Sequence, residues 1–410
     1  MESEESTGQK LEGHIPGFAA ELWFVCSDSS VDCSREQGAH IAKHAVIGNG
    51  LIIQFGGKRY TNSGIINRAL ENVRSGRFPK HLYPSECAHL VHVLHQEYPS
   101  VLDGAYDKFA GPSFEKAALE SFKSRYRGQR TCSIDEIGFE DYFLLFELVH
   151  NKLCVTNPER FHVRGVFRRM FLDAVFDDGA IQTVHERFPN AMGDWLLDWD
   201  VVYTTNYDRN LELASSTEVL HLHGAFHVLS DVYDPDSFRN QLSEDLLDGE
   251  KVDWRYPHLY STCLVSYVSD LKSYSMRQAS MANSAMEKFT SAYQDDPLIT
   301  AEIDSWDEDL PLLQRLREAI KIKAETPGIR HPEQYPTDRY REISGDLTIV
   351  GLSPMNDNHV FDEVAANEAI DDVNYYYYED AEAALVAKRL EGKKVALLDI
   401  RDLWEELGRQ

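Results

Sequence analysis

The chain has 410 residues, of which 43% are hydrophobic and 11% aromatic, so it is long and apolar enough to form a large packed core. Its formal net charge of −27 argues against a broad surface that coats nucleic acid, although it leaves room for a local anion pocket. No run of about 18 apolar residues is present, and the acidic residues 1–15 do not read as a signal peptide. We therefore expect a cytoplasmic protein without membrane contact.

The first 40 residues are irregular apart from one apolar patch, and we interpret them as an N-terminal extension to an α/β domain over 41–410. Residues 44–53, HAVIGNGLII, predict a buried strand that is broken by the stretch Gly48-Asn49-Gly50. A glycine-containing loop and a helix over 65–76 follow. A strand, a glycine loop and a helix in this order are typical of an α/β unit that holds phosphate.

Helical periodicity dominates from about 84 to 195, which predicts a large helical insertion, and a second helical segment spans about 230–335. The expected fold is a Rossmann-like, doubly wound, mostly parallel sheet with a large helical insertion or lobe. Its strands are predicted at 44–50, 200–205, 218–222, 346–351, 373–378 and 394–399.

Several of these strands end in small or polar residues. The turns are Gly48-Asn49-Gly50, Thr204-Thr205-Asn206-Tyr207-Asp208, His223-Gly224 and Gly351-Leu352-Ser353, with Asp357 shortly after the last. Because a doubly wound sheet binds ligands beyond the carboxyl ends of its strands, we expect these turns to line one crevice.

Each motif also has a structural interpretation. The glycines can form a tight turn only, and Asn206 or Asp208 can cap a helix that follows them. His221 and His223 lie two residues apart, so on a strand they should face the same side, and either can be a buried structural histidine. The six cysteines contain no C-x-x-C pair and fit no zinc ribbon, so we expect scattered reduced thiols and no metal.

Taken in this order, the turns resemble the sirtuin-like fold, most closely its bacterial branch found in antiphage-defence and abortive-infection proteins. The resemblance covers roughly 40–75, 195–230 and 340–405, and the helical segments between carry no matching motif. The chain lacks both the Gly-Ile-Pro-Asp-Phe-Arg-like run and the four-cysteine zinc module of deacetylase sirtuins. The defence branch implies instead an enzyme that hydrolyses NAD to nicotinamide and ADP-ribose and so depletes NAD.

For that reaction we expect three catalytic residues. Asn206 would hold a ribose hydroxyl and a water, His223 would accept a proton, and Asp208 would orient a partner or stabilise positive charge. The glycines would let backbone N–H groups approach the pyrophosphate, with Lys58 and Arg59 adding positive charge. The NAD-binding residues are expected to be Gly48, Asn49, Gly50, Thr205, Gly351, Ser353 and Asp357.

Two other functions stay open. One is a catalytically silent module that binds NAD or ADP-ribose and regulates a defence complex, and the other is a protein deacylase or ADP-ribosyltransferase. Because unregulated loss of NAD would kill the host, we expect a homo-oligomer that is controlled by its assembly. The resemblance also implies a partner ATPase of the translocase type or a phage-derived activator, with no direct contact to nucleic acid.

Overall fold

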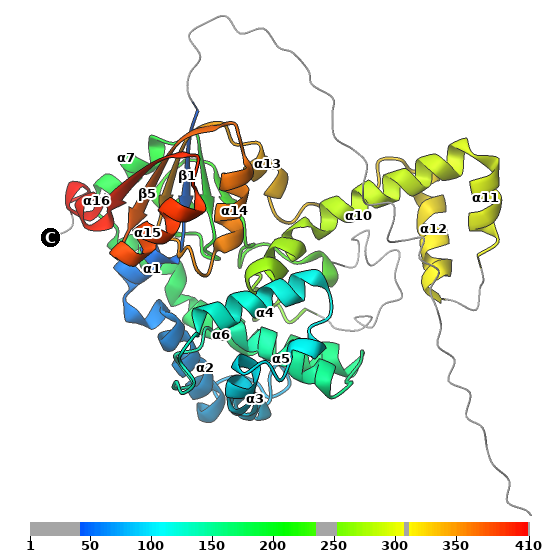
Figure 1. Cartoon of the computed structure of the whole chain (residues 1–410), viewed down its shortest axis with the longest axis horizontal. Helices are drawn as coiled ribbons and strands as arrows, with labels where there is room; N and C mark the ends of the chain where they lie inside the picture. The colour runs from blue at the N-terminus through cyan, green and yellow to red at the C-terminus, as the bar shows by residue number, and fades with distance from the viewer. Residues whose placement is uncertain (1–41, 235–251, 307–310, 409–410) are drawn as a thin grey trace, which may run out of the picture. The chain divides into compact units, whose positions relative to one another are not determined.

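The structure, a computed structural model, describes residues 42–234, 252–306 and 311–408. The expected N-terminal extension therefore lies outside the described residues, as does part of the expected second helical segment. Within them, Figure 1 shows a twisted sheet with helices packed along it. The sheet has six strands, all parallel, in the order β3-β2-β1-β4-β5-β6.

From β1 the strands run outward to β3 on one side, and from β4 they run outward to β6 on the other, so the order reverses between β1 and β4. This is the strand order of dinucleotide-binding Rossmann folds, and it confirms the predicted fold class. The strands are β1 (Lys43–Ile47), β2 (Val201–Thr204), β3 (Val219–His221), β4 (Gly345–Val350), β5 (Ile370–Tyr377) and β6 (Lys394–Asp399).

The first predicted strand was too long. Residues from Asn49 onward form helix α1 (Asn49–Gly56), because the Gly48 N–H makes a last bond to the β4 residue Val350 and the chain then turns. The next helix, α2 (Asn62–Ser75), begins earlier than predicted, since the Thr61 side chain accepts a hydrogen bond from the Gly64 N–H and caps it.

Both faces of the central strands β1, β2 and β4 are buried, as is usual for parallel strands, whereas the edge strand β6 is more exposed. Val46 of β1 points into one core, and its neighbours Ala45 and Ile47 point into the other. The Val46 face is covered by α13 (Thr337–Arg341), α14 (Asn358–Ala366) and α15 (Asp380–Arg389), and the other by α7 (Ala191–Leu197), α8 (Asn210–Ala214) and α16 (Ile400–Glu406).

The helical insertion forms a lobe whose core, rich in buried aromatic side chains, also includes Tyr207 and Phe226 from the turns after β2 and β3. Besides α2 it contains α3 (Glu86–Leu102), α4 (Ser113–Arg125), α5 (Asp141–Lys152) and α6 (Glu159–Phe176). The predicted helical character of this block is thus confirmed.

The second helical segment contains α10 (Ser269–Asp295), α11 (Pro297–Asp304) and α12 (Pro311–Glu325). Helix α10 contacts both α4 of the lobe and α14 beside the sheet. In the described parts of the chain, no helix combines the length and the apolar character needed to cross a bilayer. Short 3₁₀ helices connect the larger elements: η1 (Lys58–Tyr60), η2 (Asp107–Phe109), η3 (Asp177–Arg187), η4 (Asp231–Tyr233) and η5 (Pro257–Tyr260).

Candidate functional site

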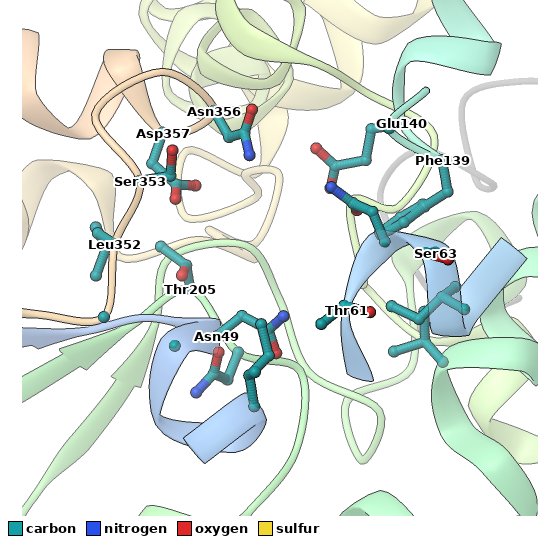
Figure 2. A pocket seen from close by; sticks show the side chains of 18 of the residues that line it. Asn49, Thr61, Ser63, Phe139, Glu140, Thr205, Leu352, Ser353, Asn356 and Asp357 are labelled. Carbon is teal, nitrogen blue, oxygen red and sulfur yellow. The ribbon is translucent and has the colours of Figure 1, made fainter. Parts of the chain in front are cut away.

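A cavity of about 1110 Å³ lies beyond the carboxyl ends of β1, β2 and β4, where the strand order reverses. Of the residues predicted to be catalytic or to bind NAD, all except Gly48 line it. One side, the strand-end wall, consists of Asn49, Thr205, Asn206, Asp208, His223, Ser353 and Asp357. The other side, the helical wall, consists of Thr61, Ser63, Phe139, Glu140 and Lys272. Figure 2 shows the labelled members of the two walls on opposite sides of the opening.

Three glycines allow the turns after β1 and β4 to touch. A Cβ atom on Gly50 would lie 2.6 Å from the Gly351 Cα, and one on Gly48 would lie 2.5 Å from the Gly351 carbonyl oxygen. Gly351 itself has a φ of +70°, which favours glycine.

The expected use of the glycine N–H groups was wrong. The Gly48 N–H donates to the Val350 carbonyl at 2.8 Å, and the Gly50 N–H donates to the Gly351 carbonyl at 2.9 Å. Both donors are therefore committed to holding the two turns together, and neither is available to a pyrophosphate. The glycines shape this edge of the sheet through close packing instead.

Asn206 follows β2 and is only 5% exposed. Its Nδ2 donates to the Gly48 carbonyl at 3.3 Å, and its backbone N–H donates to the Thr204 Oγ1 at 3.1 Å. Its Oδ1 is buried without a hydrogen-bond partner. An unsatisfied buried acceptor is costly, by about 1–3 kcal/mol, so a donor from a bound ligand would be favoured here. The amide nitrogen of Asn206 is thus held by Gly48, and the amide oxygen can accept a hydrogen bond.

Asp208 is not the N-cap residue considered for this turn, because that position is Arg209, but Asp208 bonds the start of the helix. Its Oδ1 accepts hydrogen bonds from the backbone N–H of Asn210 at 3.0 Å and from the Asn210 side chain, at the first residue of α8. Its Oδ2 is buried without a partner, and burial raises the pKa of this carboxyl to about 6. One oxygen is therefore bound within the protein, and the other has no hydrogen-bond partner, in a residue that lines the cavity.

His221 and His223 lie in different environments. The expectation that they face the same side of the strand was wrong. Strand β3 ends at His221, so the strand alternation does not extend to His223. The His221 ring lies between the Asn206 carbonyl, 2.8 Å from Nδ1, and the Glu212 carboxylate, 2.8 Å from Nε2. Burial lowers the pKa of His221, but the hydrogen bond and charge of Glu212 outweigh burial and raise it above its usual value.

His223 is paired with a residue that the sequence did not single out. Its Nε2 lies 2.8 Å from the Nε2 of His359, the second residue of α14. Burial, together with the charge of Lys272, lowers the pKa of His223 well below its usual value and that of His359 to about 3. Both rings are therefore neutral, and one Nε2–H donates to the other Nε2. The only signal for His359 was its place at the end of the polar turn SPMNDNH.

The helical wall contributes the charged pair Glu140 and Lys272, which the sequence did not reveal either. Glu140 stands at the start of α5, and its Oε1 accepts from the Lys272 Nζ of α10 at 2.6 Å. Burial raises the pKa of Glu140 to about 7 against the opposing charge of Lys272. Burial also raises the pKa of Asp357 across the cavity. Neither member of the pair stands in a motif, and in sequence each resembles an ordinary charged residue of a helix.

The remaining predicted residues lie at the edges of the cavity. The Asn49 Nδ2 donates to the Tyr60 carbonyl at 3.1 Å, and the Thr205 N–H donates to the Ile47 carbonyl at 3.2 Å. Lys58 lines the cavity, whereas the Arg59 side chain forms an ion pair with Asp177. Of the two cations expected beside the phosphates, only Lys58 is therefore placed to act there.

Comparison with known proteins adds no relative: no protein-family model, no curated protein and no solved structure matches this chain.

Proposed function

We propose that this protein hydrolyses NAD at the bond between nicotinamide and ribose, releasing nicotinamide and ADP-ribose. The observation that carries the proposal is the meeting of Asn206 and His223 in one cavity at the reversal point of a parallel sheet. Such reversal points are where folds of this kind bind dinucleotides. A volume of about 1110 Å³ exceeds the range of about 300–1,000 Å³ typical of small-molecule sites, which suits an extended ligand.

The buried Asn206 amide suits the task of holding the reacting ribose. Its Nδ2 is anchored to the Gly48 carbonyl, so the free Oδ1 has a fixed direction from which to accept a ribose hydroxyl or a water proton. Fixing the ribose and the attacking water relative to each other removes part of the entropic barrier.

His223 suits the role of a weak base. Its lowered pKa keeps the ring neutral, and His359 fixes its orientation through the Nε2 contact. A weak base is sufficient because nicotinamide leaves as a neutral molecule and water attacks a ribose that carries positive charge. The water proton would pass to His223 as the new C–O bond forms.

Carboxylates around the cavity favour the same chemistry. The transition state of such a cleavage resembles an oxocarbenium ion and carries positive charge. Asp208, with its free Oδ2, and the carboxylates Glu140 and Asp357 can stabilise that charge. A cationic ligand would in turn favour the ionised form of these acids, whose pKa values are raised by burial.

The direct experiment incubates purified protein with NAD and separates the products by chromatography. Formation of equal amounts of nicotinamide and ADP-ribose, lost in Asn206→Ala, is the expected result. If NAD stays intact with the isolated chain and with candidate partners alike, the hydrolase proposal is contradicted.

One observation favours a second candidate, a module that binds the nucleotide without cleaving it. The Nε2 of His223 is already engaged by His359, so only its other ring nitrogen is open to a ligand. Calorimetric titration with NAD and with ADP-ribose separates the two functions, since binding without products supports the module.

As part of the proposal, the role of the reaction is antiphage defence by NAD depletion, controlled by self-assembly, a partner ATPase or a phage-derived component. This part rests on the resemblance of the strand-end turns alone. Measuring cellular NAD during phage infection, for the wild type and Asn206→Ala, tests it. A fall in NAD that depends on Asn206 is expected.

A further inference from the structure

A second cluster of ligating side chains lies outside the lining of the cavity. It consists of Glu212 of α8, His221 at the end of β3 and His227 in the turn that follows, here called the Glu-His-His cluster. One ligand atom from each residue lies within 4.8 Å of the other two. Two imidazoles and a carboxylate form a donor set that zinc enzymes use, with water in the fourth position.

His221 is oriented as a metal ligand usually is. Its Nδ1 donates to the Asn206 backbone carbonyl at 2.8 Å. Metal-binding histidines commonly donate one ring N–H to a backbone carbonyl in this manner, which fixes the ring and leaves the other nitrogen for the ion. Here that other nitrogen, Nε2, faces the Glu212 Oε1 at 2.8 Å.

Glu212 supplies a second fixed ligand. Its Oε2 is buried and has no hydrogen-bond partner, although its Oε1 faces His221. A buried carboxylate oxygen without a donor is a costly arrangement, and a cation would satisfy both oxygens at once.

His227 closes the cluster from the solvent side. Its side chain is exposed, and the centroid of its ring lies 5.6 Å from that of His221. Two ligands are therefore fixed in the protein, while the third is free to adjust and leaves room for water.

The distances suit zinc after small movements. Tetrahedral Zn²⁺ with ligands at about 2.0–2.1 Å places neighbouring ligand atoms about 3.3 Å apart. The pair of His221 and Glu212, at 2.8 Å, would open by roughly half an ångström as the ion replaces the shared proton. We propose that the Glu-His-His cluster binds one Zn²⁺ ion, completed by water. Through His221, the bound ion would stiffen the backbone of Asn206, a consequence for activity that rests on the proposed function.

The test uses the purified full chain, freed of metal with a chelator, and two probes. Co²⁺ gives visible absorption when it occupies a tetrahedral site, and competition with a coloured chelator gives the affinity for Zn²⁺. We expect one equivalent of Co²⁺ with tetrahedral absorption, displaced by Zn²⁺. Glu212→Gln and His227→Ala should each weaken Zn²⁺ binding by about 100-fold or more, since even changes beyond the direct ligands cost about 10–100-fold.

His81→Ala is the matched control, because this histidine is 64% exposed and lies outside the cluster. It should bind both metals like the wild type. His227 is also exposed, so its variant should melt like the wild type, and a loss of binding would not reflect unfolding. Unchanged affinity in both cluster variants, or the absence of tetrahedral Co²⁺ absorption in the wild type, overturns the proposal and leaves a Glu212–His221 ion pair. NAD cleavage does not enter this test, so its outcome is independent of the proposed function.

Discussion

The two walls of the cavity are built on different principles. The strand-end wall is held by the backbone: three glycines in contact, and bonds from β1 to β4 and from Asn206 to the turn after β1. In the helical wall, a side-chain ion pair between Glu140 and Lys272 joins the lobe to α10, beside the packing of α10 on α4. Positions in the first wall are therefore fixed by the sheet, whereas positions in the second depend on the docking of two helical segments.

The two walls should therefore contribute differently to function. Groups that must meet a reacting ribose precisely belong on the rigid wall, and groups that set the charge of the cavity can sit on the other. Changes on the strand-end wall should affect turnover, and changes on the helical wall should affect stability first.

The largest effect is expected from Asn206→Ala and His223→Ala. Each should reduce nicotinamide release by about 10²–10⁴, through loss of positioning or of the base. Melting temperatures should fall only modestly, because both side chains line the cavity, although they are 5% and 2% exposed and each gives up one hydrogen bond. His162→Ala, at an exposed histidine of α6, is the control. Wild-type turnover in either variant removes that residue from the mechanism, and a large drop in melting temperature restores its structural interpretation.

The second largest effect is expected from loss of the ion pair between Glu140 and Lys272 in the helical wall. Lys272→Met leaves the Glu140 carboxylate buried without its partner, and breaking a fully buried pair costs about 3–5 kcal/mol of unfolding free energy. The Glu140 side chain is 20% exposed, so we expect about 2–3 kcal/mol, measured by urea unfolding. The double variant Glu140→Gln/Lys272→Met should recover part of the loss. If the single and double variants lose the same amount, the pair does not hold this wall.

Gly50→Ala should have a smaller effect on the free energy of unfolding, because it crowds the contact between Gly50 and Gly351. A Cβ on Gly50 would lie 2.6 Å from the Gly351 Cα, and overpacking of this kind typically costs about 1–3 kcal/mol. Gly165→Ala is the matched control, because it lies within α6 and a Cβ there meets nothing within 4 Å. It should stabilise the helix by about 0.5–1 kcal/mol. Equal unfolding free energies for the two variants would show that the turns can move apart.

The smallest effect concerns the pH dependence of folding stability. It should differ between His221 and the His223–His359 pair. His359 has a pKa of about 3 in the folded chain against 6.5 for a free histidine, so below pH 6.5 the unfolded chain binds the proton and stability falls. At pH 5.5 this costs about 1.4 kcal/mol, a loss that His359→Asn should remove.

The contribution of His221 to stability should change with pH in the opposite direction. Its raised pKa gives stability that is fully present below pH 6.5 and is lost as the pH rises through the folded pKa. His221→Asn should therefore lose more stability at pH 5.5 than at pH 8. Unfolding curves at both pH values check these signs, and parallel pH profiles for the two variants would contradict the assigned environments.

The fold and the strand-end wall were largely predictable. Apolar runs ending in small or polar residues mark parallel strands, and the topology then brings their ends together, as it does for Asn206 and Gly351. The exact strand ends were less predictable. HAVIGNGLII reads as one strand, and only the bond from Gly48 to Val350 explains why the chain turns there.

The helical wall could not be predicted, for a physical reason. Glu140 and Lys272 are separated by 132 positions and meet only because α10 packs on the lobe. Before that docking is known, each is one charged residue among many on helices. His227 and Glu212 were missed for a similar reason, since a turn and a short helix, rather than a regular spacing, bring them to His221.

The central position of β1 also has a consequence for the order of synthesis. β1 pairs with β4, and about 300 residues separate them in the chain. At a translation rate of about 5–20 residues per second, roughly 15–60 s pass before β4 exists. Until then one edge of β1 has no partner, and Gly351, which packs against Gly48 and Gly50, has not been made. A nascent chain therefore lacks the side of the cavity that Gly351, Ser353 and Asp357 form until the residues after β4 have been made.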